Sequence, residues 1–386
     1  MKPIRIAGYA HSKFGKLESQ SLESLIHDIG IAAINNSEID PKDLDGVWVS
    51  NFNGGLQKSN FISSMGLLDL PELRFKPTVR VENACASGSA AVFAAIDALE
   101  SGRAKSALVI GAEKMTDLDT NEVTDVLARA SHLSEEYEKG LSFPGIFAKY
   151  ADAYFKLYGD QSKALAQIAV KNHENGMLNE LAHLQKLLDV DFCLSESPKN
   201  PIVAPPLKRS DCSPISDGAA AIILTTTPEG RMKNVKLRSR YQVNDYLALS
   251  KRDFVKFEGP RLAWQKALAE AKCTINNLDL FEVHDCFTIA ELLSYEAMGL
   301  AEVGQGWKLL EDGATKRDGK FPVNVSGGLK TKGHPIGATG VSMLVMAARQ
   351  IAGEAGSLQL NKANMAGVFN MGGSGVANYV SILESA

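Results

Sequence analysis

The segment spanning residues 77–113 constrains the fold of this chain more than any other stretch. An apolar strand at 77–82 leads into a turn that carries Cys85, then into a helix of small and apolar residues at 87–101, then into a second apolar strand at 106–113. The helix contains only two charged residues, which favours burial on most of its faces. Strands that alternate with buried helices predict an α/β fold in which the helices pack on a sheet.

Cys85 is a candidate nucleophile because it lies between a strand and the N-terminus of this helix. The free N–H groups and the positive end of the helix dipole favour an anion there, so we expect a lowered thiol pKa. An isolated buried cysteine more often packs as a small hydrophobic residue. The strand, turn and helix context brings the two interpretations into balance.

The second half of the chain, which we expect to start near Val235, shows a faint echo of this order. We predict a strand at 321–325, followed by a glycine-rich turn, a small-residue helix at 337–353 and an apolar strand at 366–370. Such an echo is weak evidence for two duplicated halves. We predict an N-terminal half at 1–234 and a C-terminal half at 235–386, with a charged, helical insertion at about 114–205 in the first.

Composition excludes several classes of function. The net charge is −4 and the isoelectric point is near 6.0, which gives no sign of a nucleic-acid-binding surface. No apolar run approaches the roughly 18 residues that a membrane span needs. The five cysteines are irregularly spaced, which favours a reducing compartment, and we expect a cytoplasmic protein.

Three further turns carry groups that could act chemically. They are 282–287, which contains His284 and Cys286; 328–340, which contains His334; and 370–375, which is rich in glycine. Each follows a predicted strand, and open α/β sheets form their clefts at the C-terminal ends of strands. If these turns meet Cys85, they supply a complete set of groups for covalent catalysis.

These motifs, taken together and in this order, resemble the four active-site motifs of the thiolase superfamily. The matching segments are Asn83-Ala84-Cys85-Ala86-Ser87-Gly88, His284-Asp285-Cys286-Phe287, Gly333-His334-Pro335 and Gly372-Gly373-Ser374-Gly375. The resemblance covers essentially the whole chain. The His-Asp-Cys-Phe motif is similar to that of the sterol-carrier-protein-type thiolases and the archaeal-type acetoacetyl-CoA thiolases.

The resemblance implies a five-layered αβαβα fold built from two similar βαβαβαββ halves, with an inserted helical loop domain that helps to hold coenzyme A. It implies acyl-CoA and coenzyme A as substrates and no cofactor or metal. Such enzymes form homodimers or homotetramers, and the archaeal-type relatives work with a small acyl-CoA-binding companion protein.

The resemblance also implies a role for each site residue. His334 takes the proton of Cys85, and the sulfur then forms an acyl-enzyme. Cys286 exchanges a proton with the α carbon of acetyl-CoA, while His334 and His284 are candidate donors to the enolate oxygen. The backbone amides of Cys85 and Gly372 would hold the acyl oxygen. Two acyl-transfer steps predict ping-pong kinetics in making or cleaving a 3-ketoacyl-CoA such as acetoacetyl-CoA.

One departure from the common pattern is Asn370, which stands where many thiolases have their second cysteine. Acid and base chemistry then falls to Cys286, as in the His-Asp-Cys-Phe subgroup. The set of Cys85, His284 and His334 also resembles decarboxylating ketoacyl synthases, so an acyltransferase with a non-CoA acceptor remains an alternative. A non-catalytic scaffold subunit is a third.

Other interpretations of the polar residues also remain. His284 and Cys286 could form half of a metal site, but the sequence has no matching pair. Coenzyme A phosphates could be met by Lys208 and Arg209, although a solvated charged face is the favoured interpretation; the same holds for the basic residues of 236–240. Three other cysteines match no motif and are interpreted as packing or surface thiols: Cys193, Cys212 and Cys273.

Overall fold

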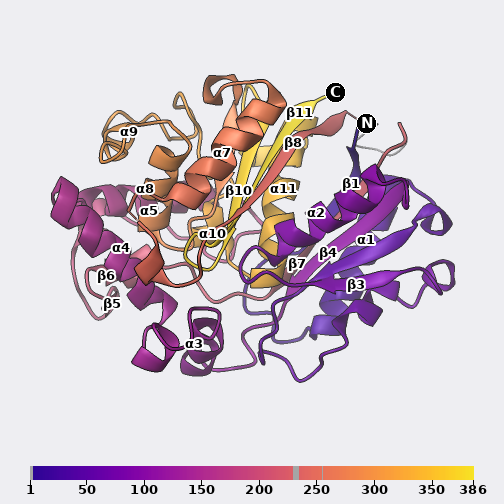
Figure 1. The fold of residues 1–386 in the computed structure, drawn as a ribbon, viewed down its shortest axis with the longest axis horizontal. Helices are drawn as coiled ribbons and strands as arrows, with labels where there is room; N and C mark the ends of the chain where they lie inside the picture. The colour runs from indigo at the N-terminus through magenta and orange to yellow at the C-terminus, as the bar shows by residue number, and fades with distance from the viewer. Residues whose placement is uncertain (1–2, 229–233, 254) are drawn as a thin grey trace.

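The computed structural model describes residues 3–228, 234–253 and 255–386 (Figure 1). The strands are β1 (Arg5–His11), β2 (Gly46–Ser50), β3 (Thr78–Val81), β4 (Ser106–Glu113), β5 (Ile202–Ala204), β6 (Leu207–Lys208), β7 (Gly218–Thr225), β8 (Val235–Asn244), β9 (Leu280–Val283), β10 (Met365–Gly372) and β11 (Ala377–Ser385). Nine of them form one mixed sheet in the order β3-β2-β4-β7-β1-β8-β11-β10-β9, while β5 and β6 form a separate hairpin.

The helices connect these strands and cover their faces. They are α1 (Leu22–Ser37), α2 (Ser87–Glu100), α3 (Thr120–Ala128), α4 (Phe143–Tyr158), α5 (Ser162–Met177), α6 (Val190–Leu194), α7 (Glu258–Ala271), α8 (Thr288–Ala297), α9 (Lys308–Glu311), α10 (Gly328–Lys332) and α11 (Ile336–Ala352). No helix among the described ranges is both long and apolar enough to cross a membrane.

The large sheet divides into two halves where β1 meets β8. These two strands pair only at Arg5 and Lys236 within the described part of the chain. In the first half β7 runs antiparallel to both β1 and β4, and β2 is parallel to β4. In the second half β11 runs antiparallel to both β8 and β10, and β9 is parallel to β10. The two halves therefore share one pattern of strand pairing.

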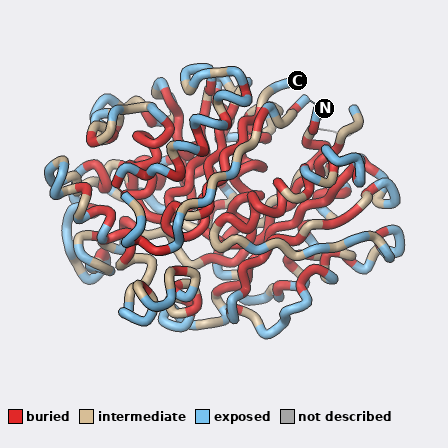
Figure 2. Tube along the Cα trace, in the orientation of Figure 1, coloured by how far each residue is buried: buried red, intermediate tan, exposed pale blue. Residues whose placement is uncertain are grey.

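Helices and sheet halves form the five layers expected of the fold (Figure 1). Helix α1 packs on β1, β4 and β7, and α7 packs on β8 and β11. Between the two sheet halves lie α2 and α11, which contact each other, and α11 contacts both β4 and β10. The predicted αβαβα arrangement is confirmed. The sheet and the two central helices form the buried interior, whereas the connecting loops are largely exposed (Figure 2).

One predicted strand is wrong. Residues 321–325 form a single parallel bridge, between Val323 and Phe281, rather than a strand. The reason is Asn324, which has a left-handed backbone with φ of 54°, a conformation that interrupts an extended strand. Its side-chain oxygen instead accepts a hydrogen bond of 2.9 Å from the Val283 amide.

The region between β4 and β7 holds α3 to α6 and the β5-β6 hairpin, and it lies to one side of the layers (Figure 1). On α4, Tyr150 and Tyr154 are fully buried, so these tyrosines belong to the core. The boundaries of the insertion at about 114 and 205, and the division of the chain at 234, remain predictions.

The two central helices touch through glycine residues near their N-termini. A Cβ atom on Gly88 of α2 would lie 2.7 Å from the Gly340 amide nitrogen of α11, and one on Gly340 would lie 2.3 Å from the Ser89 nitrogen. Any side chain at either position would therefore push the helices apart. Because the helices meet here, the turns that precede them, which carry Cys85 and His334, are brought side by side.

Candidate active site

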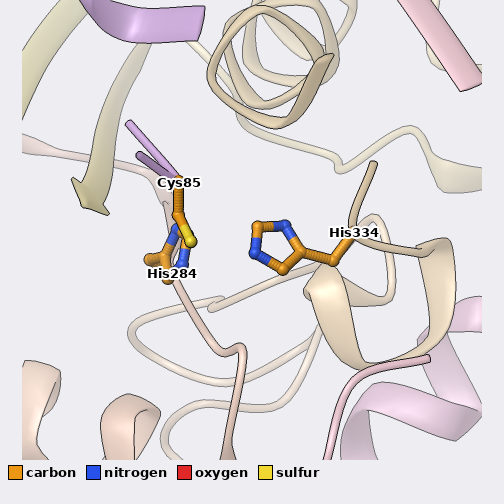
Figure 3. Close-up of side chains that lie close together, drawn as sticks. All are labelled: Cys85, His284 and His334. Carbon is orange, nitrogen blue, oxygen red and sulfur yellow. The ribbon is translucent and has the colours of Figure 1, made fainter. Parts of the chain in front are cut away.

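Cys85, His284 and His334 come from three different turns and meet at one point (Figure 3). One side-chain atom of each residue, the sulfur or a ring nitrogen, lies within 4.8 Å of the other two. The two imidazole rings are 5.0 Å apart and almost perpendicular, at 86°. Within the described ranges these three atoms are close enough to bind a soft divalent ion together. They are equally well placed to exchange protons with one another.

Cys85 occupies a strained turn between β3 and α2. Ala84, immediately before it, has a left-handed backbone with φ of 49°, a conformation that costs energy in a residue other than glycine. The turn is closed by a hydrogen bond of 3.0 Å from the Ala86 amide to the Asn83 carbonyl. Cys85 therefore lies just outside α2, and its side chain turns towards the histidines (Figure 3).

The prediction of a lowered pKa for Cys85 is wrong. Burial raises the pKa of this thiol to about 12, and the nearby carboxyl groups of Glu82 and Glu113 raise the pKa further. Hydrogen bonds from the amides of Gly373 and of Cys85 itself lower the pKa but do not outweigh burial. The resting residue is a neutral thiol, so a nearby base is required to activate it.

His334 is placed to be that base. Its Nδ1 lies 2.7 Å from the hydroxyl of Thr339, and that hydroxyl donates its proton over 3.0 Å to the Pro335 carbonyl. The hydroxyl oxygen must therefore accept from Nδ1–H, which leaves Nε2 as the unprotonated nitrogen. Burial, with a smaller contribution from Lys332, lowers the pKa of His334 to about 3, so the ring is neutral near pH 7.

His284 has the opposite tautomer. Asn370 uses its side-chain amide group twice, over 2.9 Å to His284 Nδ1 and over 3.2 Å to the Cys85 carbonyl. Both amide protons are thus committed, so Nδ1 accepts and Nε2 carries the hydrogen. This Nε2–H is buried and has no partner among the described residues. Burial and His334 lower the pKa of His284, so a neutral N–H donor faces the site.

Cys286 lies beside this cluster, in the wall of a cavity that Cys85 and His334 also line. Burial is the main cause that raises its pKa well above the ordinary value, and the neighbouring Cys85 is the second. The Cys286 carbonyl accepts a hydrogen bond of 2.9 Å from the Ser213 amide, which fixes the backbone. A thiol in this state can donate a proton to a carbanion formed next to it.

Two buried carboxyl groups hold the catalytic turns in place. Asp285 accepts the amides of Leu329 and Lys330 at 2.6 and 3.2 Å, and so fixes α10 just before His334. Burial is the main cause that raises its pKa to about 7. Glu113 accepts the amide of Gly337 at 2.9 Å, just after His334, together with the Phe52 amide from the loop that follows β2. Burial likewise raises the pKa of Glu113 to about 7.

A cavity of about 550 Å³ opens onto Cys85, Cys286 and His334. Its lining is mainly apolar and includes Phe52, Met115, Leu127, Phe143, Phe147, Phe287 and Ile336. Three cationic residues also line it, namely Lys16, Arg209 and Lys330. No acidic side chain is present among the described lining residues. The cavity thus favours a largely apolar ligand that carries negative charge.

Gly372 lies beside Cys85, but it is not part of the cavity lining. A Cβ atom there would lie 2.5 Å from the Asn83 carbonyl, so only glycine allows this close approach to the nucleophile turn. Its neighbour Gly373 lines the cavity. The role of the Gly372 amide remains a prediction, and the Gly373 amide is a second candidate donor because it already hydrogen-bonds to the Cys85 thiol.

The comparisons with known proteins agree with this geometry. The family described as "Thiolase, N-terminal domain" matches residues 4–228, and "Thiolase C-terminal domain-like" matches residues 242–385. This chain belongs to the thiolase family.

Relatives of this thiolase include an acetyl-CoA acetyltransferase of Methanothermobacter thermautotrophicus, which is 37% identical over 100% of both chains. Sterol carrier protein 2 of Homo sapiens is 29% identical over 96% of this chain and 70% of its own length. Among solved structures, "Ltp2-ChsH2(DUF35) aldolase" has a TM-score of 0.82 at 21% identity, covering 100% of this chain and 98% of that one. Human mitochondrial 3-ketoacyl-CoA thiolase has a TM-score of 0.75 at 16% identity, covering 100% and 99%.

Sequence reasoning misses several residues that shape the thiolase site. Cys212, expected to be a packing or surface thiol, lines the cavity. In the sequence, Asn370 is notable only because many thiolases have a cysteine at this position. In the structure, its side-chain amide orients His284. Arg209 lines the cavity. The basic residues of β8 do not line it, and one of them, Arg238, forms an ion pair of 2.5 Å with Glu384 on the surface. The position of Cys212 immediately before a proline-containing turn gives no signal for the cavity.

Proposed function

We propose that this thiolase is an acyl-CoA C-acyltransferase that makes or cleaves a 3-ketoacyl-CoA such as acetoacetyl-CoA through a covalent intermediate on Cys85. The observation that carries the proposal is the meeting of Cys85, His284 and His334 beside the cavity that Cys286 also lines. The name of the archaeal relative, acetyl-CoA acetyltransferase, supports the same reaction.

In the first step the Cys85 sulfur attacks the C3 carbonyl of the 3-ketoacyl-CoA while His334 Nε2 takes its proton. The thiol and the imidazole are both neutral at rest, so the proton moves as the new bond forms rather than beforehand. Negative charge then develops on the carbonyl oxygen. The backbone amides of Cys85 and of Gly372 or Gly373 are the candidate donors that stabilise this charge.

In the second step the C2–C3 bond breaks and its electron pair remains on the acetyl-CoA fragment as an enolate. His284 Nε2–H, buried and otherwise without a partner in the described structure, is a donor for the enolate oxygen. Cys286 gives its proton to the α carbon. His334 then passes the proton it holds to Cys286 and takes the proton of the coenzyme A thiol as that sulfur attacks the acyl group. The bond from the acyl carbon to the Cys85 sulfur breaks, and Cys85 recovers a proton from His334. In the synthetic direction the same steps run in reverse, with Cys286 as the base.

A decarboxylating synthase is the second candidate, because the Cys85, His284 and His334 cluster would suit it as well. Such an enzyme obtains its carbanion by loss of carbon dioxide and needs no base at Cys286. We therefore compare wild type with Cys286→Ser and Cys85→Ser in thiolysis of acetoacetyl-CoA. Cys273→Ser is the control, because Cys273 lies just beyond the C-terminal end of α7 and does not line the cavity.

The thiolase proposal predicts turnover by wild type and by Cys273→Ser, and a loss of at least about 100-fold in Cys286→Ser, which is the size expected for a missing general acid. Cys85→Ser should be inactive. Full thiolysis by Cys286→Ser would remove Cys286 from the mechanism. No thiolysis by wild type, combined with decarboxylation of a malonyl thioester, would favour the synthase instead.

We also propose that the chain forms a homodimer or homotetramer through β3. This strand lies at the edge of the large sheet, with Val79 43% exposed and the nearby Phe75 88% exposed. An exposed apolar edge strand is a natural site for pairing with a second copy. Sedimentation equilibrium tests this proposal, and a monomer at assay concentration would refute it.

Further proposals concern coenzyme A, a companion protein and location. Lys16 and Arg209 are exposed residues at the cavity and suit the phosphates of coenzyme A. We propose that this chain has a small acyl-CoA-binding companion protein. The name of the structural neighbour, Ltp2-ChsH2(DUF35) aldolase, contains two protein names, which supports this proposal, and a pull-down with this chain as bait tests it. All five cysteines are free thiols, which supports a reducing compartment such as the cytoplasm.

A further inference from the structure

Lys330 lines the cavity but has no part in the steps above. The residue is only 3% exposed. Among the described residues its ammonium nitrogen makes no hydrogen bond and no ion pair, and this nitrogen keeps access to the cavity. Burying a cation in this way is costly unless something compensates the charge. The absence of a protein partner therefore points to a ligand.

The structure fixes the position of Lys330 and commits the carboxyl groups around it elsewhere. Asp285 accepts the Lys330 amide at 3.2 Å, so its oxygens hold the backbone of α10 rather than the ammonium. Asp211 accepts the Thr288 hydroxyl at 2.8 Å and the Lys208 amide at 2.8 Å. Burial lowers the pKa of Lys330, while the neighbouring Cys212 and Asp211 raise it by smaller amounts.

The surroundings of Lys330 indicate which part of a substrate would reach it. Lys16 and Arg209 are exposed, and phosphates bound to them would stay hydrated. Lys330 is enclosed with the thiols of Cys212 and Cys286 on the same cavity lining. A negative group that reaches it must itself be buried, as the acyl part of a substrate bound at Cys85 would be.

We propose that Lys330 binds a carboxylate carried by the acyl chain, so that the preferred substrates are 3-ketoacyl-CoA thioesters whose chain ends in a carboxylate. This proposal rests on the thiolase reaction proposed above. When such a substrate is cleaved, the Cys85 sulfur gives its proton to His334 and bonds to C3. The C2–C3 bond breaks, and its electron pair takes a proton from Cys286 so that acetyl-CoA leaves. The remaining acyl group keeps its carboxylate against Lys330 until coenzyme A accepts it.

The test compares two substrates that differ only at the end of the chain, 3-ketoadipyl-CoA and 3-ketohexanoyl-CoA. Wild type should have the higher kcat/KM with 3-ketoadipyl-CoA. In Lys330→Met, which keeps an unbranched side chain only one atom shorter but removes the charge, this preference should fall about 10- to 100-fold, as expected for a lost charge-assisted contact. Lys330→Arg should keep most of the preference.

Controls separate this proposal from its alternatives. Lys16→Met should lower kcat/KM for both substrates by the same factor, because it removes a contact to the shared coenzyme A. An equal loss on both substrates in Lys330→Met would place the ammonium against coenzyme A and overturn the proposal. A wild-type preference for 3-ketohexanoyl-CoA would overturn it too. Thermal unfolding verifies that Lys330→Met folds.

Failure of the reaction itself would be visible separately. Acetoacetyl-CoA, which has no terminal carboxylate, reports on the thiolase activity alone. If wild type turns over none of the three substrates, calorimetric binding of 3-ketoadipyl-CoA and 3-ketohexanoyl-CoA to Cys85→Ala still tests Lys330. Tighter binding of the carboxylate substrate, lost in Cys85→Ala combined with Lys330→Met, would support the proposal. Equal binding would refute it.

Discussion

Thr339→Val is the substitution that tests the assignment of His334 as the base. Valine keeps the branched shape of threonine but lacks the oxygen that accepts from His334 Nδ1–H over 2.7 Å. The N–H would then be buried without a partner, at a cost of about 1–3 kcal/mol that a change of tautomer relieves. The other tautomer puts the proton on Nε2, where the base needs a lone pair. We expect kcat/KM for thiolysis to fall about 10- to 100-fold, since about 1.4 kcal/mol corresponds to tenfold.

The matched control is Thr339→Ser, which keeps the oxygen and should stay close to wild type. Steady-state thiolysis of acetoacetyl-CoA gives kcat/KM, and a single-turnover experiment gives the rate at which Cys85 is acylated. The acylation rate should fall with kcat/KM, because proton removal from Cys85 belongs to that step. If Thr339→Val acylates as fast as Thr339→Ser, the tautomer argument fails and His334 is not the base.

Two more predictions follow from the site and the helix contact. Because the pKa of Cys85 is raised to about 12, the thiol form is favoured at neutral pH. The rate of alkylation of Cys85 by iodoacetamide should therefore rise steadily from about pH 7 to pH 10. A rate that reaches a plateau near neutral pH would show a lowered pKa and contradict this prediction. Gly340→Ala should destabilise the fold by about 1–3 kcal/mol, because the added Cβ meets the Ser89 nitrogen at 2.3 Å. Gly145→Ala, where the nearest atom is 3.7 Å away, is the control in thermal unfolding, and equal melting temperatures would contradict the close packing of α2 on α11.

Sequence patterns predict the alternation of strands and helices and the turns of the site because both depend on local order along the chain, whereas the five layers are implied by the resemblance to thiolases. Apolar strands, small-residue helices and glycine-rich turns are visible within a dozen residues. The strand predicted at 321–325 is wrong because Asn324 adopts a left-handed backbone and uses its side chain to replace a ladder bond. Nothing in the apolar pattern of that stretch indicates this geometry.

The electrostatics of the site could not be predicted in the same way. The helix dipole at Cys85 is a local feature, whereas the burial that raises its pKa comes from segments far away in the sequence, such as those that carry His284 and His334. Lys330 is another example, since a lysine between a leucine and a threonine in a glycine-rich turn is typical of a surface residue. Only the folded chain shows that it is enclosed at the cavity.

The central claim is that Cys85 carries the acyl group while Cys286 moves the proton at the α carbon. The most direct measurement is intact mass spectrometry with peptide mapping after Cys286→Ser is mixed with acetyl-CoA, followed by addition of free coenzyme A. We expect one acetyl group on Cys85, its discharge when coenzyme A is added, and no acetoacetyl-CoA formed. An acetyl group on any other residue, or acetoacetyl-CoA made at the wild-type rate by this variant, would contradict the account.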